Sequence, residues 1–258
     1  MKYCYVRFRS NKQLYFNTVI DSIHVHEVRK WPVRFFFLFF GTWFCTFAVR
    51  KRKMATSQTP FLYPVMEQFY TLQGEGHHVG KPSYFIRLAG CDVGCVWCDV
   101  KESWNTEGYP VHTADQLAQE ASDSGTEIVV VTGGEPCMHP LKELTEALQA
   151  KGLKTHLETS GVHPLTGTWD WICFSPKKFG APKADIFEQA NEFKPIVFHH
   201  SDLKWAAQLA EKINADCLKF LQPEWSKRDE VMPIILNYLR GNPSWRLSLQ
   251  THKFIGIP

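Results

Sequence analysis

Residues 90–98 read Gly-Cys-Asp-Val-Gly-Cys-Val-Trp-Cys, and they place Cys91, Cys95 and Cys98 in one short loop. Spacings of three and two intervening residues allow this loop to wrap around three corners of a cubic iron–sulfur cluster. Two glycines in the loop permit the backbone turns that such wrapping needs. Three thiolates leave one of four irons without a protein ligand, and an open metal position is typical of a catalytic site.

The same loop is also compatible with a structural zinc site, which normally has four ligands. The fourth ligand could be one of four nearby residues: His77, His78, Cys137 or His139. Clustered cysteines in a chain with no convincing export signal indicate metal ligands rather than disulfides. A non-enzymatic zinc-binding module is therefore the alternative from a different functional class.

Strand and helix patterns alternate on both sides of the cysteine loop. Ser83–Leu88 and the β-branched run in Glu127–Thr132 are expected strands, and Thr113 to Gln116 has the pattern of a capping box that begins a helix. Further strands are expected at 154–159, 171–174, 195–198, 217–221 and 245–249, and further helices at 141–152, 202–213 and 229–239. Such alternation predicts an α/β fold with a mainly parallel sheet, whose chemistry lies at the carboxyl ends of the strands.

Residues 1–53 differ from the rest of the chain. They hold 11 Lys and Arg but only two acids, a net charge of +9, which leaves −6 for the other 205 residues of a chain whose total is +3. Their apolar stretch 35–49 is 15 residues long, whereas a membrane span needs roughly 20. We predict that Met54 is the natural start, that residues 1–53 are an upstream extension, and that residues 54–258 form the domain. A disordered segment or a short membrane anchor is the alternative.

The composition of the chain also excludes some partners. An apolar fraction of 44% and a charged fraction of 21% are those of a globular protein. The acidic part from residue 54 onward has no basic stripe that would follow a phosphate backbone, so we expect no direct contact with nucleic acid. We also expect no membrane partner and a cytoplasmic location.

The cysteine spacing, with Trp97 before the last cysteine, resembles the radical S-adenosylmethionine superfamily. Gly133-Gly134-Glu135-Pro136 follows the Val-rich strand, as the GGEP motif of that superfamily does. The resemblance covers nearly all of residues 62–258. It implies a partial (β/α) barrel that binds a [4Fe–4S] cluster and S-adenosylmethionine.

The resemblance also implies a set of cofactor-binding residues. Gly133 and Gly134 would let backbone carbonyls approach the amino group of the cofactor, and Glu135 would add a carboxylate acceptor. Residues placed like Glu158 and Ser160 touch the ribose and the methionine carboxylate in relatives. The further members of the set are Trp97, Ser175, Lys177 and Gln222. Trp97 could be a core residue, but its place between two cysteines suggests that it shields the cluster or flanks a bound adenine. Taken alone, the Ser160 hydroxyl is more often that of an ordinary turn or helix-cap residue.

Four segments resemble the 7-carboxy-7-deazaguanine synthase family more specifically. They are Gln73-Gly74-Glu75-Gly76, Phe85-Ile86-Arg87-Leu88, Trp97-Cys98-Asp99 and the tail from Leu249 to Pro258. Members of this family are carbon–nitrogen lyases of the pathway to queuosine. They convert 6-carboxy-5,6,7,8-tetrahydropterin to 7-carboxy-7-deazaguanine with loss of ammonia.

A substrate-binding set follows from this resemblance. Arg87 offers a guanidinium fork for a carboxylate, although a surface ion pair is the alternative for this residue. Gln73 and Glu75 can pair with the amino-pyrimidinone edge of the pterin. The resemblance places His252 and the terminal carboxylate of Pro258 near the substrate as well.

One residue departs from the family pattern. In the family, the residue after Trp-Cys-Asp is Thr or Ser, and its hydroxyl can bind Mg²⁺; here it is Val100. Magnesium would then rely on Asp99, backbone carbonyls, substrate oxygens or water.

The resemblance further implies a homodimer and a flavodoxin- or ferredoxin-type electron donor. The alternative within the superfamily is an enzyme such as a glycyl-radical activase. An activase acts on a protein partner and would not need the set of Arg87, Glu75 and His252.

Overall fold

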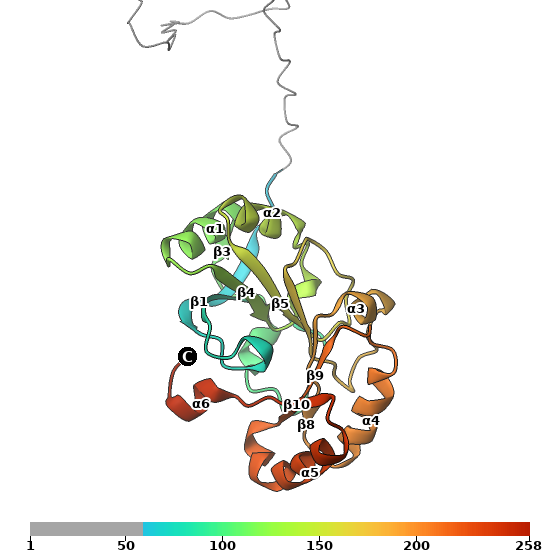
Figure 1. The fold of residues 1–258 in the computed structure, drawn as a ribbon. Helices are drawn as coiled ribbons and strands as arrows, with labels where there is room; N and C mark the ends of the chain where they lie inside the picture. Colours follow the sequence, from blue (N-terminus) through green and yellow to red (C-terminus); the bar gives the residue numbers. More distant parts are fainter. Residues whose placement is uncertain (1–58) are drawn as a thin grey trace, which may run out of the picture. The chain divides into compact units, whose positions relative to one another are not determined.

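A computed structural model describes residues 59–258 of the chain (Figure 1). The prediction that residues 1–53 are an upstream extension falls outside the described residues and stays a prediction. Within residues 59–258, no helix has the length and apolar character that crossing a membrane requires.

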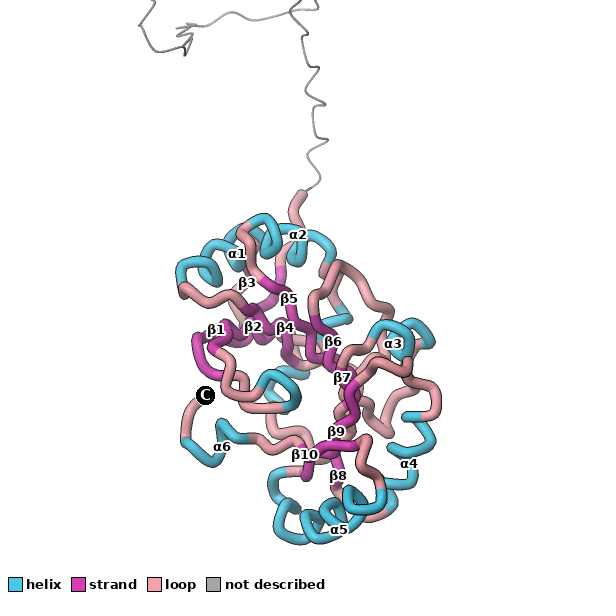
Figure 2. Tube along the Cα trace, in the orientation of Figure 1, coloured by secondary structure: helices cyan, strands magenta, loops and turns pink. Residues whose placement is uncertain are grey.

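One sheet organises the described residues. Its strands are β1 Tyr63–Leu72, β2 Pro82–Leu88, β3 Val111–His112, β4 Ile128–Gly133, β5 Lys154–Thr159, β6 Trp171–Phe174, β7 Glu192–Phe193, β8 Ile196–Val197, β9 Leu218–Pro223 and β10 Trp245–Leu247. Their order is β10-β9-β7-β6-β5-β4-β2-β1-β3, with β8 beside β9. The pairs from β2 to β10 are parallel, whereas β1 is antiparallel to both β2 and β3. Among the described residues β10 and β3 do not pair with each other, so the sheet follows an open arc (Figure 2).

Helices cover the outer side of this arc (Figure 2). They are α1 Ala114–Asp123, α2 Lys142–Ala150, α3 Ala184–Gln189, α4 Ser201–Ala210 and α5 Arg228–Gly241, followed by the short C-terminal α6 Thr251–Ile255. The order of strands and helices confirms the predicted α/β class and is that of a partial barrel.

The two faces of the sheet differ in polarity because successive side chains of a strand point to opposite faces. Val129 and Val131 of β4 and Leu157 of β5 are fully buried in the main core, which also contains Leu144 and Leu148 of α2. His156 and Glu158 alternate with Leu157 and therefore lie on the inner face. The inner face thus carries polar side chains toward the interior of the arc.

Most of the expected elements are confirmed. Thr113 caps α1 through a complete capping box with Gln116, and the strands expected at 154–159 and 171–174 have the predicted bounds. The strand expected at 195–198 is reduced to the two residues of β8, and the helix expected at 202–213 ends at Ala210. The sequence patterns missed β1, whose alternation is interrupted by a register shift between Val65 and Glu67.

The C-terminal segment runs from the β10 end of the arc to β1. The backbone N–H of Thr251 donates to the carbonyl of Gly74 at 2.9 Å, just beyond the end of β1. The Thr71 hydroxyl donates to a terminal carboxylate oxygen of Pro258 at 3.0 Å. These contacts bring the tail after β10 to β1, at the other side of the opening.

Candidate active site

A cavity of about 270 Å³ lies on the inner side of the arc. All 17 residues that the sequence assigned to the cluster, cofactor or substrate line this cavity: Gln73, Glu75, Arg87, Cys91, Cys95, Trp97, Cys98, Gly133, Gly134, Glu135, Glu158, Ser160, Ser175, Lys177, Gln222, His252 and Pro258. These residues are spread over the sequence from residue 73 to residue 258, and the fold brings their side chains together at one cavity.

The cysteine loop follows β2 and is held from two directions. The backbone N–H of Gly90 donates to the carbonyl oxygen of Ser103 at 2.6 Å, and that of Cys91 donates to the carbonyl oxygen of Trp104 at 3.2 Å. Gly90 and Gly94 have φ angles of 108° and 71°, which a residue with a side chain rarely adopts. The local sequence thus fixes the loop conformation that the spacing of the cysteines predicted.

The glycines after β4 serve to pack this loop. A Cβ atom on Gly133 would lie 2.1 Å from the carbonyl oxygen of Leu88, and one on Gly134 would lie 2.4 Å from that of Gly90. The backbone N–H of Glu135 donates to Gly90 at 2.8 Å. The Gly-Gly pair therefore lets the end of β4 touch the cysteine loop directly, a use that the sequence reasoning did not foresee.

The three cysteines of the loop carry free thiols at the wall of the cavity. Cys91, Cys95 and Cys98 are free and line one cavity, and burial raises the pKa of Cys91 and of Cys95. In residues 59–258, no three His, Cys, Asp or Glu side chains are placed around one point as ligands of one ion. In a cubane each cysteine binds a different iron, so its ligands need not converge.

The four residues suggested as a fourth zinc ligand have other environments. His139 Nε2 lies 2.8 Å from the carbonyl oxygen of Ala89, and burial raises the pKa of Cys137 to about 12. His77 and His78 pack against Trp171, with ring centroids 5.0 and 4.5 Å from the indole. These environments do not support the zinc alternative.

Glu135 differs from the sequence expectation. Its side chain is 1% exposed, and one carboxylate oxygen accepts from the Cys137 backbone at 3.1 Å and from the Thr159 hydroxyl at 2.6 Å. The other oxygen accepts from the backbone at 2.8 Å and from the hydroxyl of Ser160. Because four donors already satisfy this carboxylate, Glu135 joins the end of β4 to the end of β5 rather than offering a free acceptor.

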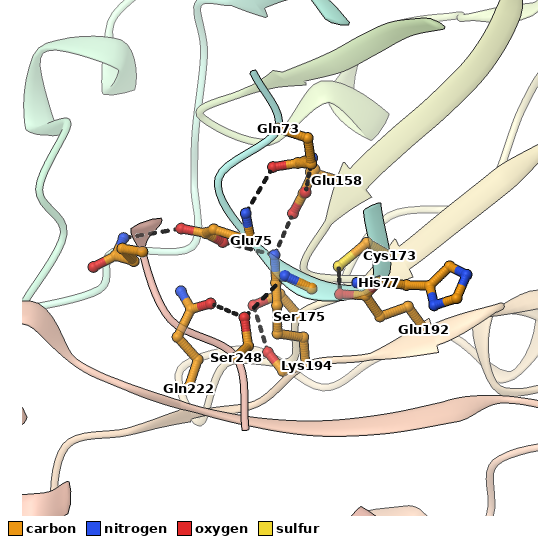
Figure 3. Close-up of polar contacts among 12 residues, drawn as sticks. Gln73, Glu75, His77, Glu158, Cys173, Ser175, Glu192, Lys194, Gln222 and Ser248 are labelled. Carbon is orange, nitrogen blue, oxygen red and sulfur yellow. Dashed lines mark hydrogen bonds and ion pairs between the residues drawn. The ribbon is translucent and has the colours of Figure 1, made fainter. Parts of the chain in front are cut away.

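A buried lysine that the sequence reasoning missed lines the same cavity and lies between Glu75 and Glu158 (Figure 3). Lys194 is 2% exposed, and its Nζ lies 2.6 Å from Glu75 Oε2 and 3.0 Å from Glu158 Oε2. The Gln73 amide donates to Glu158 at 3.3 Å, and the Gln250 amide donates to Glu75 at 2.9 Å. Two carboxylates predicted for different ligands thus share one cation.

The charges of this group follow from their mutual contact. Burial favours the neutral amine of Lys194, but the surrounding anionic groups, Glu158, Glu75 and Glu192 among them, raise its pKa well above the usual value. Burial favours the neutral form of Glu75 as well, yet the charge and hydrogen bond of Lys194 lower the pKa of Glu75 to about 2. Lys194 and Glu75 are therefore ionised at neutral pH.

Arg87 combines its two predicted environments. Its Nε lies 2.6 Å from Glu67 Oε1, across the antiparallel pair of β2 and β1, which is the ion pair considered as the alternative. The same side chain lines the cavity. Because Glu67 contacts Nε, the two terminal nitrogens of the guanidinium remain for a carboxylate in the cavity.

His252 and Asp99 complete the wall near the C-terminus. The His252 ring packs against Gly74, where a Cβ atom would lie 2.1 Å from Nδ1, and burial lowers the pKa of His252. Asp99 pairs with Lys253 at 2.6 Å. Val100 lines the cavity as its position predicted, and it brings no oxygen to the magnesium site considered above.

The remaining predicted residues form the wall between these groups. The Lys177 amine donates to the carbonyl of Ser175 at 2.9 Å and to its hydroxyl at 2.7 Å, and it lies 5.5 Å from the centroid of the Trp97 ring. Trp97 is therefore a cavity residue in a cation–π contact rather than part of the core. The side-chain oxygen Oε1 of Gln222 accepts a hydrogen bond from the Ser248 hydroxyl at 2.7 Å.

Comparison with known proteins agrees with this geometry. The family described as the Radical SAM superfamily matches residues 85–173. A 7-carboxy-7-deazaguanine synthase of Flavobacterium psychrophilum is 49% identical over 197 residues, 76% of this chain and 93% of the relative. Relatives with the same name from Synechocystis sp. and Escherichia coli K12 are 47% and 35% identical, over 76% of this chain and 93% and 99% of their own lengths. The crystal structure of QueE from Escherichia coli has a TM-score of 0.68 and 34% identity, and the match covers 74% of this chain and 95% of that one.

Proposed function

The chain belongs to the 7-carboxy-7-deazaguanine synthase family of radical S-adenosylmethionine enzymes, and we propose that it converts 6-carboxy-5,6,7,8-tetrahydropterin to 7-carboxy-7-deazaguanine with loss of ammonia. Family membership implies a lyase that uses a [4Fe–4S] cluster and S-adenosylmethionine. The observation that carries the proposal is that every residue expected to serve the cluster, the cofactor or the pterin lines one cavity.

The cavity has two sides, which we name by their residues. The cofactor side consists of the cysteine loop with Trp97, the Gly133–Glu135 segment, Glu158, Ser160, Ser175, Lys177 and Gln222. The substrate side consists of Gln73, Glu75, Arg87, His252 and Pro258. When bound, the cluster supplies the electron that splits S-adenosylmethionine and so provides the hydrogen-abstracting radical.

The protein binds and orients the reactants. Cys91, Cys95 and Cys98 hold the cluster in this proposal, and Arg87 binds the carboxylate of the pterin with the nitrogens that Glu67 leaves unoccupied. Gln73 and Glu75 fix the amino-pyrimidinone edge. A walled cavity also excludes water and oxygen from the reaction.

Some finer properties belong to the same proposal. We expect a homodimer and a flavodoxin- or ferredoxin-type electron donor. We also expect the enzyme to use Mg²⁺ and to bind it with few protein ligands, because the Val100 side chain has no oxygen. We expect a cytoplasmic location, where the six free cysteines among residues 59–258 stay reduced.

Anaerobic reconstitution of the full chain with iron and sulfide, followed by assay on the carboxy-tetrahydropterin, tests the proposal. We expect about four irons per chain, 5′-deoxyadenosine, and a deazaguanine product. A colourless protein with stoichiometric zinc would instead support the non-enzymatic module. Formation of 5′-deoxyadenosine without the deazaguanine would favour an activase-like function over the synthase function.

A further inference from the structure

Lys194 lies where the substrate side and the cofactor side meet. It directly follows β7, and its Nζ contacts Glu75, which belongs to the segment after β1, and Glu158, near the end of β5. These partners are 119 and 36 residues away in the sequence. We propose that Lys194 is a positioning residue that holds the segment 73–78 against the end of β5 and thereby makes substrate binding and cofactor binding depend on each other.

The backbone of Lys194 is fixed from the sheet. Its N–H donates to the carbonyl of Phe174 at 2.8 Å, and its own carbonyl accepts from the Ser175 hydroxyl at 3.0 Å. The side chain reaches from this anchored backbone to both carboxylates. Lys194 therefore links two carboxylates of like charge, which cannot pair with each other, to the backbone at the end of β7.

The charges around Lys194 explain why one amine matters to several segments. Glu192 adds a third carboxylate nearby; its Oε2 accepts from the His77 backbone at 3.0 Å. Without the amine, Glu75 and Glu158 would lose the positive charge that they share, and Glu192 would lose a nearby one. We expect such a region to relax by loosening the segment 73–78, because the other polar contacts of this segment are single hydrogen bonds, as of Gly76 with Ser248 and of Gln73 with Glu158, while His77 and His78 stay packed on Trp171.

The segment 73–78 carries Gln73 and Glu75, and β5 leads to Glu158 and Ser160. This inference rests on the proposed function, because only there do these residues serve two different ligands. A ligand that fixes Glu158 also fixes Lys194, and through it Glu75. The two ligands should then bind with positive cooperativity that disappears when the amine is removed.

Hydrogen–deuterium exchange on the reconstituted full chain tests the positioning role without any assay of turnover. In Lys194→Met, we expect peptides covering 73–78 and 158–161 to exchange about tenfold faster than in the wild type, while peptides of α1 and α2 keep their rates. Lys219→Met is the matched control. Lys219 lies on β9 beside Phe193, and its amine lies 5.9 Å from the Trp245 ring centroid rather than between carboxylates. This control should leave both peptides within about twofold of the wild type.

A triple variant guards against simple unfolding of Lys194→Met. This variant combines Glu75→Gln, Glu158→Gln and Lys194→Met, so that the amine and the two carboxylates in contact with it are all replaced by neutral groups. A buried site tolerates the removal of all its charges better than the loss of one partner. We expect it to unfold at a higher temperature than Lys194→Met but to keep fast exchange in 73–78. A uniform increase of exchange over all peptides, or wild-type exchange in both segments, would overturn the positioning role.

Binding measurements separate this inference from the proposed function. In the wild type, the carboxy-tetrahydropterin should tighten the binding of S-adenosylmethionine by about fivefold or more, and in Lys194→Met this factor should fall to about one. An unchanged factor in Lys194→Met contradicts the inference. A wild type that does not bind the pterin at all contradicts the proposed function, whereas the exchange experiment still decides the role of Lys194.

Discussion

The cofactor side and the substrate side of the cavity are built in different ways. On the cofactor side, Gly134 packs on the cysteine loop through backbone atoms, and the buried Glu135 carboxylate accepts hydrogen bonds from four neutral donors. On the substrate side, oppositely charged side chains meet in pairs, as Glu75 does with Lys194 and Arg87 with Glu67. The first arrangement is rigid by close packing, and the second depends on charge.

The largest effect should come from breaking the cofactor side at its cluster. Cys95→Ala removes one of only three thiolates, so we expect the iron content to fall from about four per chain to near zero. Both 5′-deoxyadenosine and deazaguanine formation should be lost. Iron analysis after anaerobic reconstitution measures this, with Cys217→Ala, a buried cysteine outside the cavity, as the control. Retention of stoichiometric iron by Cys95→Ala would contradict the assignment of this ligand.

Acid should lower the stability of the folded protein through His78 and His156, which lie behind the substrate side of the cavity. Burial lowers the pKa of His78 and of His156 to about 4, so both rings are neutral in the folded protein at neutral pH. In the unfolded chain a histidine binds a proton near pH 6.5, so the unfolded state takes up more protons, and stability falls as the pH drops from about 6.5 to about 4. For His156, which is 6% exposed, this loss amounts to about 3 kcal/mol.

Urea unfolding at several pH values measures this loss. His156→Phe keeps a ring but cannot take up a proton, so its free energy of unfolding should change less over the same pH window than that of the wild type. His200→Phe, at an exposed position, is the control and should keep the wild-type slope. Equal pH dependence in all three proteins would show that His156 is not buried neutral.

A smaller effect is expected from Glu135→Gln on the cofactor side. The amide must turn one NH₂ toward groups that now donate to the carboxylate, so one buried donor loses its acceptor at a cost of about 1–3 kcal/mol. Thermal unfolding measures this loss, and Glu188→Gln, at an exposed position, serves as control. A melting temperature equal to that of the wild type would mean that the four hydrogen bonds of Glu135 do not stabilise this side.

The smallest effect concerns magnesium at the border of the two sides. Val100→Thr adds one hydroxyl to the cavity wall, so we expect half-maximal activity at about two- to fivefold lower Mg²⁺ concentration than in the wild type. Val100→Ala changes the size of the side chain without adding oxygen and should not produce this shift. Identical Mg²⁺ titrations of Val100→Thr and the wild type would remove any role for position 100 in metal binding.

The same contrast explains what the sequence could predict. The cysteine loop and the capping box of α1 are local patterns, and the structure shows the positive φ angles of Gly90 and Gly94 and the complete capping box that these patterns predict. The strand β1 was missed because its register shift interrupts the alternation of side chains. Short elements such as β7 and α6 lack enough residues to show a period.

Lys194 shows why the substrate side was predicted incompletely. Its neighbours in the sequence, Phe193 and Pro195, give no sign that its amine is buried, and its partner Glu75 is 119 residues away. The use of Glu135 was likewise missed because Thr159 and Ser160 approach it only in the folded chain. Contacts across such separations follow from the order of strands, which single-sequence patterns do not supply.

The separation of the two sides is tested most directly by measuring 5′-deoxyadenosine and deazaguanine in parallel for Arg87→Ala. Loss of the guanidinium leaves the substrate carboxylate without its charged partner, which costs about 3–5 kcal/mol when such a pair is buried. We therefore expect kcat/KM for the deazaguanine to fall by about a hundredfold or more, while the cluster and slow cleavage of S-adenosylmethionine persist. An unchanged yield of deazaguanine per 5′-deoxyadenosine, with kcat/KM lowered by less than about fivefold, would show that Arg87 does not bind the substrate and that the two sides are not separate.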